Sequence, residues 1–305
     1  MASVEPVRLA VIGAGRMGRT HLRALARARG VGAVAVVEPV AAVREELDDG
    51  RLRVWPTVEE LLDHGGIDGA VIAAPTDLHL ELVTRVAAAG LPILCEKPCG
   101  MRPEETREAV RVATDAGVVL QVGYWRRFVP ALTALRERLA SGELGVPLLV
   151  SCWQWDAEPP PPAFRERSGG ILLDMGVHEL DQIRWLTGRE IEEIVAFAGG
   201  IDADSATALV RLEGGTAATI SLGRMFPHGD CCWVELMGTS GHVRELFMWG
   251  AEGTRVFEDA LVAQAEAFAA AVRGEPPRGA GGEDAIHAIE AADRAARSLA
   301  AAAAF

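Results

Sequence analysis

The sequence is poor in cysteine and tyrosine, with 5 cysteines and 1 tyrosine among 305 residues. The cysteines, at positions 95, 99, 152, 231 and 232, form no CxxC pair and none of the Cys/His spacings typical of zinc, so we expect no metal site. Their number is odd, and residues 1–7 lack the charged-then-apolar order of a signal peptide. Both features predict reduced thiols in a cytoplasmic protein.

Long apolar runs and an excess of positive charge are also absent. No run reaches the roughly 18 consecutive apolar residues of a membrane span, so we expect no membrane partner. The 43 acidic residues outnumber the 30 basic ones, and the formal net charge of −13 disfavours binding to nucleic acid or to an anionic membrane surface. Half of the residues are hydrophobic, which allows a large core, and the chain length favours two domains.

Short apolar runs alternate with helical patterns in the first part of the chain. The predicted strands are residues 7–12, 33–37, 53–55, 69–74, 92–96 and 118–122. Helices are expected between them, and Thr57 is a plausible N-cap for the helix that ends at residue 64. This alternation predicts an α/β domain with a parallel sheet of βαβ units over residues 1–123.

The pattern changes after Gly123. The predicted strands are then residues 147–155, 194–198, 205–212, 217–222, 232–237 and 242–247, and two amphipathic helices follow at 258–273 and 284–299. Strands in sequence with hairpin-like spacing predict a C-terminal α+β domain, residues 124–305, with a mostly antiparallel open sheet. We expect this domain to bind substrate. Because an open sheet needs its outer face covered, we also expect a homodimer or homotetramer.

A glycine-rich turn follows the first predicted strand. Residues 13–18, Gly-Ala-Gly-Arg-Met-Gly, stand between a strand and a helix, where glycines permit a tight turn and let a pyrophosphate approach the backbone. Glu38 closes the second strand, where a carboxylate can bind a ribose 2′-hydroxyl and repel a 2′-phosphate. These features predict a Rossmann dinucleotide-binding domain that takes NAD in preference to NADP. The expected contacts in the turn are Gly13, Gly15, Arg16, Met17 and Gly18.

Two further strands end in polar residues at the carboxyl edge of the predicted sheet, where open α/β folds bind ligands. Pro75, Thr76 and His79 follow one strand and are expected to contact the cofactor, with helix capping as the alternative for His79. Glu96, another expected cofactor contact, and Lys97 follow the next strand. Near a nicotinamide ring, the Lys97 ammonium would donate a hydrogen bond to the reacting oxygen. The alternative is a solvated surface lysine.

Asp174 and His178 are four residues apart, a spacing that predicts one face of a helix. Gly169 and Gly170 precede them and allow a close approach of the backbone to a ligand. An imidazole titrates near neutrality, so His178 suits the role of a general base, and Asp181 is placed to orient its ring. The alternative is a half-buried histidine with a structural role.

The same residues carry a family resemblance. The motifs are Ala-Pro-Thr-Asp-Leu-His (74–79), Glu-Lys-Pro (96–98), Gly-Tyr-x-Arg-Arg-Phe (123–128) and Gly-Gly-x-x-x-Asp-x-Gly-x-His (169–178). With the glycine turn, they resemble the glucose–fructose oxidoreductase/inositol dehydrogenase/rhizopine catabolism (Gfo/Idh/MocA) family over essentially the whole chain. Residues 159–181 resemble its inositol 2-dehydrogenase branch. The resemblance implies that Lys97 assists proton transfer, Asp174 holds the substrate and His178 is the acid/base.

Several positions depart from that branch. Trp125 stands where the branch usually has asparagine, and Gln154 and Trp155 stand where Arg or Ser precedes an acidic residue. Trp125, Trp153 and Trp155 either stack on a sugar ring or pack in the core. The expected substrate contacts are Lys97, Trp125, Arg127, Trp155, Asp174 and His178.

We therefore expect an NAD-dependent oxidoreductase that moves a hydride between the nicotinamide and a secondary alcohol of a cyclic polyol or sugar, with inositol the first substrate to test. One alternative is an NAD(P)H-dependent keto-sugar reductase of a secondary-metabolite pathway. Another is a non-catalytic, cofactor-binding sensor, which the set of Lys97, Asp174 and His178 disfavours because a sensor needs no acid/base.

Overall fold

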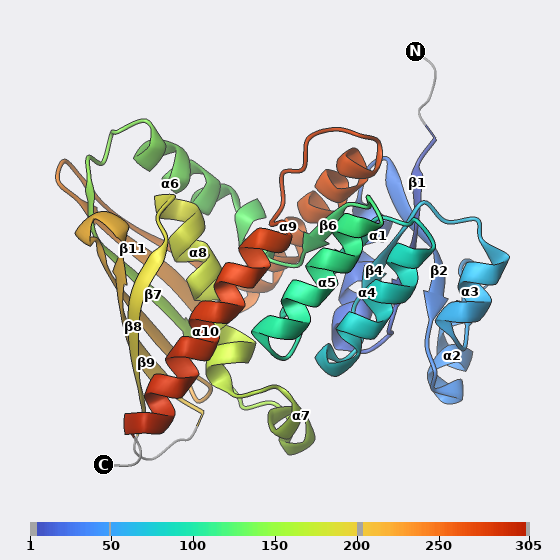
Figure 1. The fold of residues 1–305 in the computed structure, drawn as a ribbon, viewed down its shortest axis with the longest axis horizontal. Coiled ribbons are helices and arrows are strands. Elements are labelled where there is room, and N and C mark those ends of the chain that lie inside the picture. Colours follow the sequence, from blue (N-terminus) through green and yellow to red (C-terminus); the bar gives the residue numbers. More distant parts are fainter. Residues whose placement is uncertain (1–4, 49, 200–203, 303–305) are drawn as a thin grey trace. The chain divides into compact units, whose positions relative to one another are not determined.

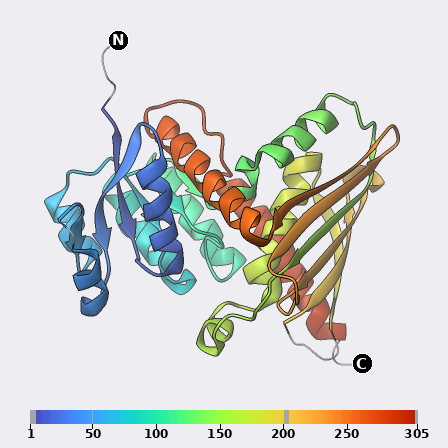
Figure 2. The same ribbon diagram turned by 180° about the vertical axis from the view of Figure 1, so that it is seen from behind.

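The structure is a computed structural model that describes residues 5–48, 50–199 and 204–302 (Figures 1 and 2). It divides the chain into two compact units. The first consists of Met1–Tyr124 and Glu258–Ala285, and the second of Trp125–Phe257 and Ile286–Phe305. The first boundary lies one residue from the predicted one. The predicted domains are residues 1–123 and 124–305. Glu258–Ala285, which the prediction places in the second domain, belongs to the first unit.

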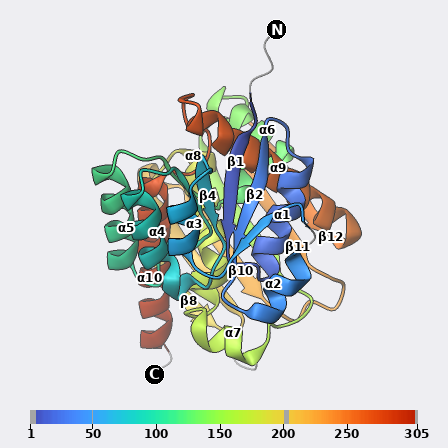
Figure 3. The ribbon, with the colours of Figure 1, turned by 90° about the vertical axis from the view of Figure 1, so that its right-hand side faces the viewer.

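The first unit contains a six-stranded parallel sheet in the order β3-β2-β1-β4-β5-β6. Its strands are β1 (Val7–Ile12), β2 (Val31–Val37), β3 (Arg53–Trp55), β4 (Gly69–Ile72), β5 (Ile93–Cys95) and β6 (Leu120–Val122). Its helices include α1 (Arg16–Arg27), α2 (Ala41–Leu47), α3 (Val58–His64), η1 (Thr76–Leu78), α4 (His79–Ala88) and α5 (Pro103–Asp115). Figure 3 shows α1 and α2 on one side of the strands and α4 and α5 on the other. The predicted α/β fold is confirmed.

Local sequence explains where these helices begin. The Thr57 hydroxyl accepts a hydrogen bond from the Glu60 N–H at 3.3 Å, so Thr57 is the N-cap of α3, as the sequence predicts. Pro103 occupies the first turn of α5, where its missing N–H costs no hydrogen bond.

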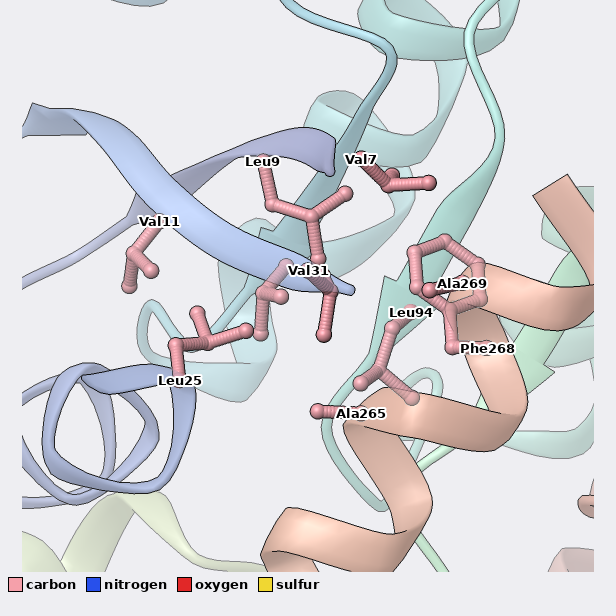
Figure 4. Close-up of a cluster of buried hydrophobic side chains, with 10 residues drawn as sticks. Val7, Leu9, Val11, Leu25, Val31, Leu94, Ala265, Phe268 and Ala269 are labelled. Atoms are coloured by element: carbon pink, nitrogen blue, oxygen red, sulfur yellow. The ribbon is translucent and has the colours of Figure 1, made fainter. Parts of the chain in front are cut away.

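A late segment of the chain completes the first core (Figure 4). Ala265, Phe268 and Ala269, on helix α9 (Gly250–Val272), pack with Leu9 of β1 and other buried apolar residues. This packing is the physical reason that Glu258–Ala285 joins the first unit. Its amphipathic pattern predicts a helix, but the pattern alone does not say which sheet the apolar face covers.

The second unit contains a six-stranded sheet in the order β12-β11-β7-β10-β9-β8. Its strands are β7 (Pro147–Trp155), β8 (Ile191–Ala198), β9 (Ala206–Leu212), β10 (Ala217–Gly223), β11 (Cys231–Gly238) and β12 (His242–Trp249). Only β7 and β10 pair in parallel among these described strands, so the predicted mostly antiparallel sheet is confirmed. The other elements are η2 (Trp125–Phe128), α6 (Pro130–Ala140), α7 (Pro162–Arg167), η3 (Leu172–Gly176), α8 (Val177–Thr187), η4 (Glu213–Gly215) and α10 (Gly282–Ala302).

The two faces of this second sheet differ. In Figures 1 and 2, α6, α8 and the Ile286–Ala302 part of α10 lie on one face, and no described helix of this unit covers the other. Residues of β9 alternate between buried and exposed along the strand. The uncovered outer face displays Val195, Phe197 and Leu209, which are 46%, 52% and 56% exposed.

None of the described helices has both the length and the apolar character needed to cross a membrane.

Candidate active site

The glycine turn has a backbone geometry suited to a pyrophosphate. Gly13 has φ +93°, and a Cβ there would lie 2.9 Å from the carbonyl oxygen of Ala73. A Cβ at Gly18 would lie 1.9 Å from the Gly13 carbonyl oxygen, so this glycine allows α1 to pack closely against the turn. Nothing lies within 4 Å of a Cβ position at Gly15, and no side chain caps the helix that begins after it. The first N–H groups of α1 can therefore bind an anion, and the turn fits NAD.

Glu38 lies directly beside the glycine turn. Its carboxylate is buried and accepts hydrogen bonds from the N–H groups of Ala14 and Val40, both at 2.9 Å. The Arg44 guanidinium binds the backbone carbonyl of Glu38 at 2.8 Å. A negative charge thus stands at the end of β2, next to the phosphate-binding turn, in agreement with a preference for NAD.

His79 joins the turns that follow two strands. Its Nδ1 lies 2.8 Å from the Pro98 carbonyl oxygen, and its Nε2 lies 2.9 Å from the Ala74 carbonyl oxygen. Burial lowers the pKa of His79, while the two carbonyl groups act in the opposite direction. The histidine therefore holds together the turns after β4 and β5, a role that the sequence did not suggest. Pro75 and Thr76 begin the short helix η1 beside it.

Glu96 supports the start of the Lys97 turn. Its carboxylate binds the buried His21 ring at 2.7 Å and accepts a hydrogen bond from the Lys97 N–H at 3.2 Å. Burial alone would raise the pKa of Glu96, but His21 and the charge of Lys97 lower it below its usual value. A Cβ at Gly123 would lie 2.9 Å from this carboxylate. The structure thus gives Glu96 a supporting role, and its contact with the cofactor stays a prediction.

Asp174 and His178 lie on a wide helical turn and the helix that follows it. Asp174 is in the π-helical turn η3, and His178 is in the first turn of α8. Gly169 and Gly170 enter this segment with φ +75° and +88°, which favour glycine. The sequence predicts an ordinary α-helical face here. A π turn is frequent at functional sites because it reorients side chains within a helix.

Asp174 is paired with an arginine that the sequence did not single out. Arg224, next after β10, is 2% exposed, and its Nη2 donates to Asp174 Oδ2. Its Nε lies 3.2 Å from the Met175 sulfur, and its Nη1 lies 3.8 Å from Asp204 Oδ2. The two partners are 50 residues apart, so no local pattern could reveal this contact.

Trp125 lies against the predicted acid/base. Its ring centroid is 6.1 Å from that of His178 in an edge-on arrangement, and 4.9 Å from that of Phe257. Trp125 is 7% exposed, and its ring is therefore buried beside these aromatic neighbours. The structure thus brings together two of the predicted substrate residues, Trp125 and His178.

Arg127 and its neighbour bind the helix that carries His178. Arg127 binds Asp181 with two hydrogen bonds, of 3.0 and 2.5 Å, while the buried Arg126 pairs with Glu179 at 2.5 Å. The Asp181 carboxylate therefore binds Arg127, and its orientation of the His178 imidazole stays a prediction. Consecutive arginines hold the start of α8 in place. A substrate contact of Arg127 stays a prediction.

Trp155 lies apart from the other predicted substrate residues of the second unit. Its Nε1–H donates to Ser221 Oγ at 3.0 Å, and its ring stacks on Trp153 with centroids 5.7 Å apart. Gln154, the preceding residue, points to the opposite face of the sheet and accepts a hydrogen bond from Arg126 at 2.6 Å. The alternation of strand residues thus puts Trp155 on the outer face, away from α8.

Asp156 is another residue that the sequence did not single out, and it is acidic. Burial raises the pKa of Asp156 to about 6, and the charges of Asp230 and Asp174 contribute to this rise. The charge of Arg224 acts in the opposite direction. Asp156 therefore shares the electrostatic environment of Asp174. The resemblance contained a signal, because an acidic residue follows residues 154 and 155 in the inositol branch.

Comparison with known proteins identifies the family. Residues 7–124 match the model of an oxidoreductase family with an NAD-binding Rossmann fold, and residues 132–244 match the GFO/IDH/MocA C-terminal domain. The chain belongs to the GFO/IDH/MocA family. The predicted family, the NAD cofactor and an NAD-dependent oxidoreductase activity are confirmed.

Individual members of the GFO/IDH/MocA family match nearly the whole chain. The rhizopine catabolism protein MocA of Rhizobium meliloti is 46% identical over 96% of this chain and 95% of its own length. Inositol 2-dehydrogenase of Rhizobium meliloti strain 1021 is 31% identical, with 96% and 97% covered. Among solved structures, GenD2 from gentamicin A biosynthesis, in complex with NAD, has a TM-score of 0.90 at 26% identity, with 98% and 96% covered.

Proposed function

We propose that the protein is an NAD-dependent dehydrogenase that oxidises a secondary alcohol of a cyclic polyol, with an inositol as substrate. The observation that carries the proposal is that Asp174, held by Arg224, and His178 lie in the consecutive helical segments η3 and α8. The identity of 31% to an inositol 2-dehydrogenase over 96% of the chain supports the substrate class.

Each residue has a defined task in this proposal. NAD supplies the hydride acceptor when it is bound. His178, as a neutral imidazole, takes the proton of the substrate hydroxyl, and Lys97 assists the proton transfer as a hydrogen-bond donor that favours the alkoxide. Asp174 accepts hydrogen bonds from neighbouring hydroxyls, and Trp125 borders the acid/base. Arg127 acts through Asp181 and α8.

Absorbance of the reduced nicotinamide tests this proposal. The purified protein is mixed with NAD or NADP and, in separate reactions, with myo-inositol, scyllo-inositol, rhizopine and common sugars. We expect NAD reduction with at least one inositol or with rhizopine. Rhizopine is included because the relative named for its catabolism is 46% identical to this chain. NAD reduction with sugars but with neither an inositol nor rhizopine would overturn the inositol assignment.

A reductase of a secondary-metabolite pathway is the second candidate. It is supported by the likeness to GenD2 from gentamicin A biosynthesis, with a TM-score of 0.90 and 26% identity. Oxidation of NADH or NADPH by keto-sugars, with no reaction of any polyol, would favour this function. Binding of NAD and a polyol without turnover in either direction would instead favour a sensor.

We also propose that a second copy of the chain covers the outer face of the second sheet in a homodimer or homotetramer. Val195 and Leu209 are directly paired across β8 and β9, and both are about half exposed. Such an apolar patch favours association. Light scattering should show a smaller assembly for Leu209→Glu than for the wild type and for Arg107→Glu, a control on the first unit. An unchanged mass for Leu209→Glu would contradict this interface.

We further propose a cytoplasmic location. All five cysteines are free thiols and buried, as expected for a protein kept in a reducing compartment. Fractionation of the source cells should recover the protein with cytoplasmic markers, and recovery with the membrane or secreted fraction would contradict the location.

A further inference from the structure

Arg224 is one of the most deeply buried charged residues of the second unit. It is 2% exposed, while its partner Asp174 retains a side-chain exposure of 16%. Burial of a guanidinium is costly unless its donors meet acceptors, and Arg224 donates to Asp174 Oδ2 and to the Met175 sulfur. Its donors face Asp174, Asp204 and the Met175 sulfur, all of which belong to the second unit.

The strand before Arg224 determines where its side chain points. Ser221 binds Trp155 on the outer face, and Leu222 lies on the inner face, where Gly176 of η3 packs on it. A Cβ at Gly223 would lie only 2.3 Å from the Trp155 ring, so the strand end is pressed against this ring. Continued alternation brings Arg224 to the inner face, beside the wide turn that carries Asp174.

The pair extends into a chain of alternating charges. Asp204 Oδ2 lies 2.6 Å from Arg165 Nε of α7 and 3.8 Å from Arg224 Nη1, so the two arginines share this carboxylate oxygen as an ion-pair partner. The order is therefore Arg165, Asp204, Arg224 and Asp174. Arg224 thus lies between the carboxylates of Asp204 and Asp174, and the Asp156 carboxyl group also interacts with its charge. This arrangement favours one orientation of its guanidinium and hence of the Asp174 carboxylate.

We infer that Arg224 is a positioning residue that orients the Asp174 carboxylate for the hydroxyl groups of the polyol, with Asp204 and Arg165 supporting it from behind. The inference rests on the proposed function, because it assigns Asp174 to the substrate. Arg224 itself touches neither the substrate nor NAD in this scheme. Its loss should therefore weaken the substrate interaction and leave the affinity for NAD unchanged.

The test compares Arg224→Ala with Arg184→Ala. Arg184 is also buried in the second unit, where it binds the half-exposed Glu190 at 2.7 and 2.6 Å, so its loss controls for the removal of a buried, paired arginine. We expect Arg224→Ala to raise the KM for the polyol roughly 10- to 100-fold, the range for a lost charge-assisted hydrogen bond, with an unchanged Kd for NAD. Arg184→Ala should lower the melting temperature and leave this KM within about twofold.

Chemical rescue separates positioning from stability. Guanidinium or ethylguanidinium, far below the concentrations that unfold the protein, should restore much of the lost substrate affinity of Arg224→Ala. Urea has nearly the same shape but no charge, so it should not restore the substrate affinity. Arg224→Lys keeps the charge without the planar fork and should be intermediate. If Arg224→Ala does not fold, Arg224→Lys compared with Arg184→Lys gives the same KM contrast.

The outcomes distinguish this inference from the proposed function. If none of the polyols supports reduction of NAD by the wild type, the proposed function fails. The affinity of the NAD complex for an inositol, measured by calorimetry, then replaces the KM in the comparison of the variants. Absence of inositol binding would overturn both. If the wild type is active and Arg224→Ala changes the polyol KM no more than Arg184→Ala does, the proposed function stands and the positioning role is refuted. Equal rescue by urea and guanidinium would also refute it.

Discussion

Asp156 should make the protein less stable at neutral pH than it is in mild acid. Burial raises the pKa of this carboxyl group from 3.8 to about 6, and the nearby charge of Asp230 adds to the effect. In the unfolded chain the group ionises near 3.8, whereas in the folded protein it keeps its proton up to about pH 6. The folded state thus binds more protons between these values. The stabilising contribution of the protonated Asp156 is full below pH 3.8 and is lost as the pH rises through about 6.

The size of the effect follows from the difference between the two pKa values. A rise from 3.8 to about 6 corresponds to a free energy of about 3 kcal/mol, at 1.36 kcal/mol for each tenfold change in the ionisation constant. Asparagine has nearly the same shape and cannot ionise. Asp156→Asn should therefore be more stable than the wild type at pH 7.5 by up to about 3 kcal/mol, and about equally stable at pH 4.

Thermal unfolding of the two proteins across this pH range is the assay. For a chain of this size, about 3 kcal/mol corresponds to a rise in Tm of roughly 6 °C. Asp63→Asn, at an exposed position of α3, is the matched control. The difference in Tm between this variant and the wild type should be the same at pH 4 and at pH 7.5. Asp230→Asn should reproduce part of the gain, because it removes one of the charges that raise the pKa of Asp156. A gain for Asp156→Asn that is the same at both pH values, or a loss at pH 7.5, would refute the reasoning.

The remaining predictions concern the chemistry. Glu38→Ser should raise the use of NADP relative to NAD, and a wild type that already prefers NADP by about tenfold, equivalent to about 1.4 kcal/mol, would contradict the role of Glu38. Lys97→Met should lower turnover by roughly 10²-fold or more while NAD still binds; retention of most activity would make the lysine a surface charge. If His178 is the base, oxidation should rise as the pH increases through the neutral range, because only a neutral imidazole accepts a proton, and His178→Ala should abolish that rise. Asp174→Asn should weaken substrate binding more than NAD binding, and equal losses would point to a general defect.

The sequence predicts elements whose signals are local. The strands Arg53–Trp55 and Pro147–Trp155 have the predicted bounds, and the Thr57 cap is where the pattern places it. The glycine turn and Glu38 are also found beside each other. In each case the deciding interaction lies within one turn, one strand or one βαβ unit, so periodicity and residue type suffice.

Other local features escaped prediction because their signals are weak. The helix α7 (Pro162–Arg167) follows a run of prolines that favours a loop, and only the proline in its first turn is compatible with a helix. The wide turn η3 consists mostly of residues that an ordinary α-helix also accepts, so its sequence does not mark it as a π turn. Gly176, the last residue of this turn, lies close to Leu222 of β10, a contact between segments that no local pattern reveals.

The sequence by itself determined the family motifs, the alternation of strands and helices and the residue types available for proton transfer. Only the tertiary structure decided that Glu258–Ala285 belongs to the first unit, that Arg127 binds Asp181, and that Arg224 lies behind Asp174. The physical reason is the range of the interactions. A strand or a glycine turn is encoded by neighbours in the chain, whereas a buried arginine obtains its partner from a segment 50 residues away, once two separate elements have packed together.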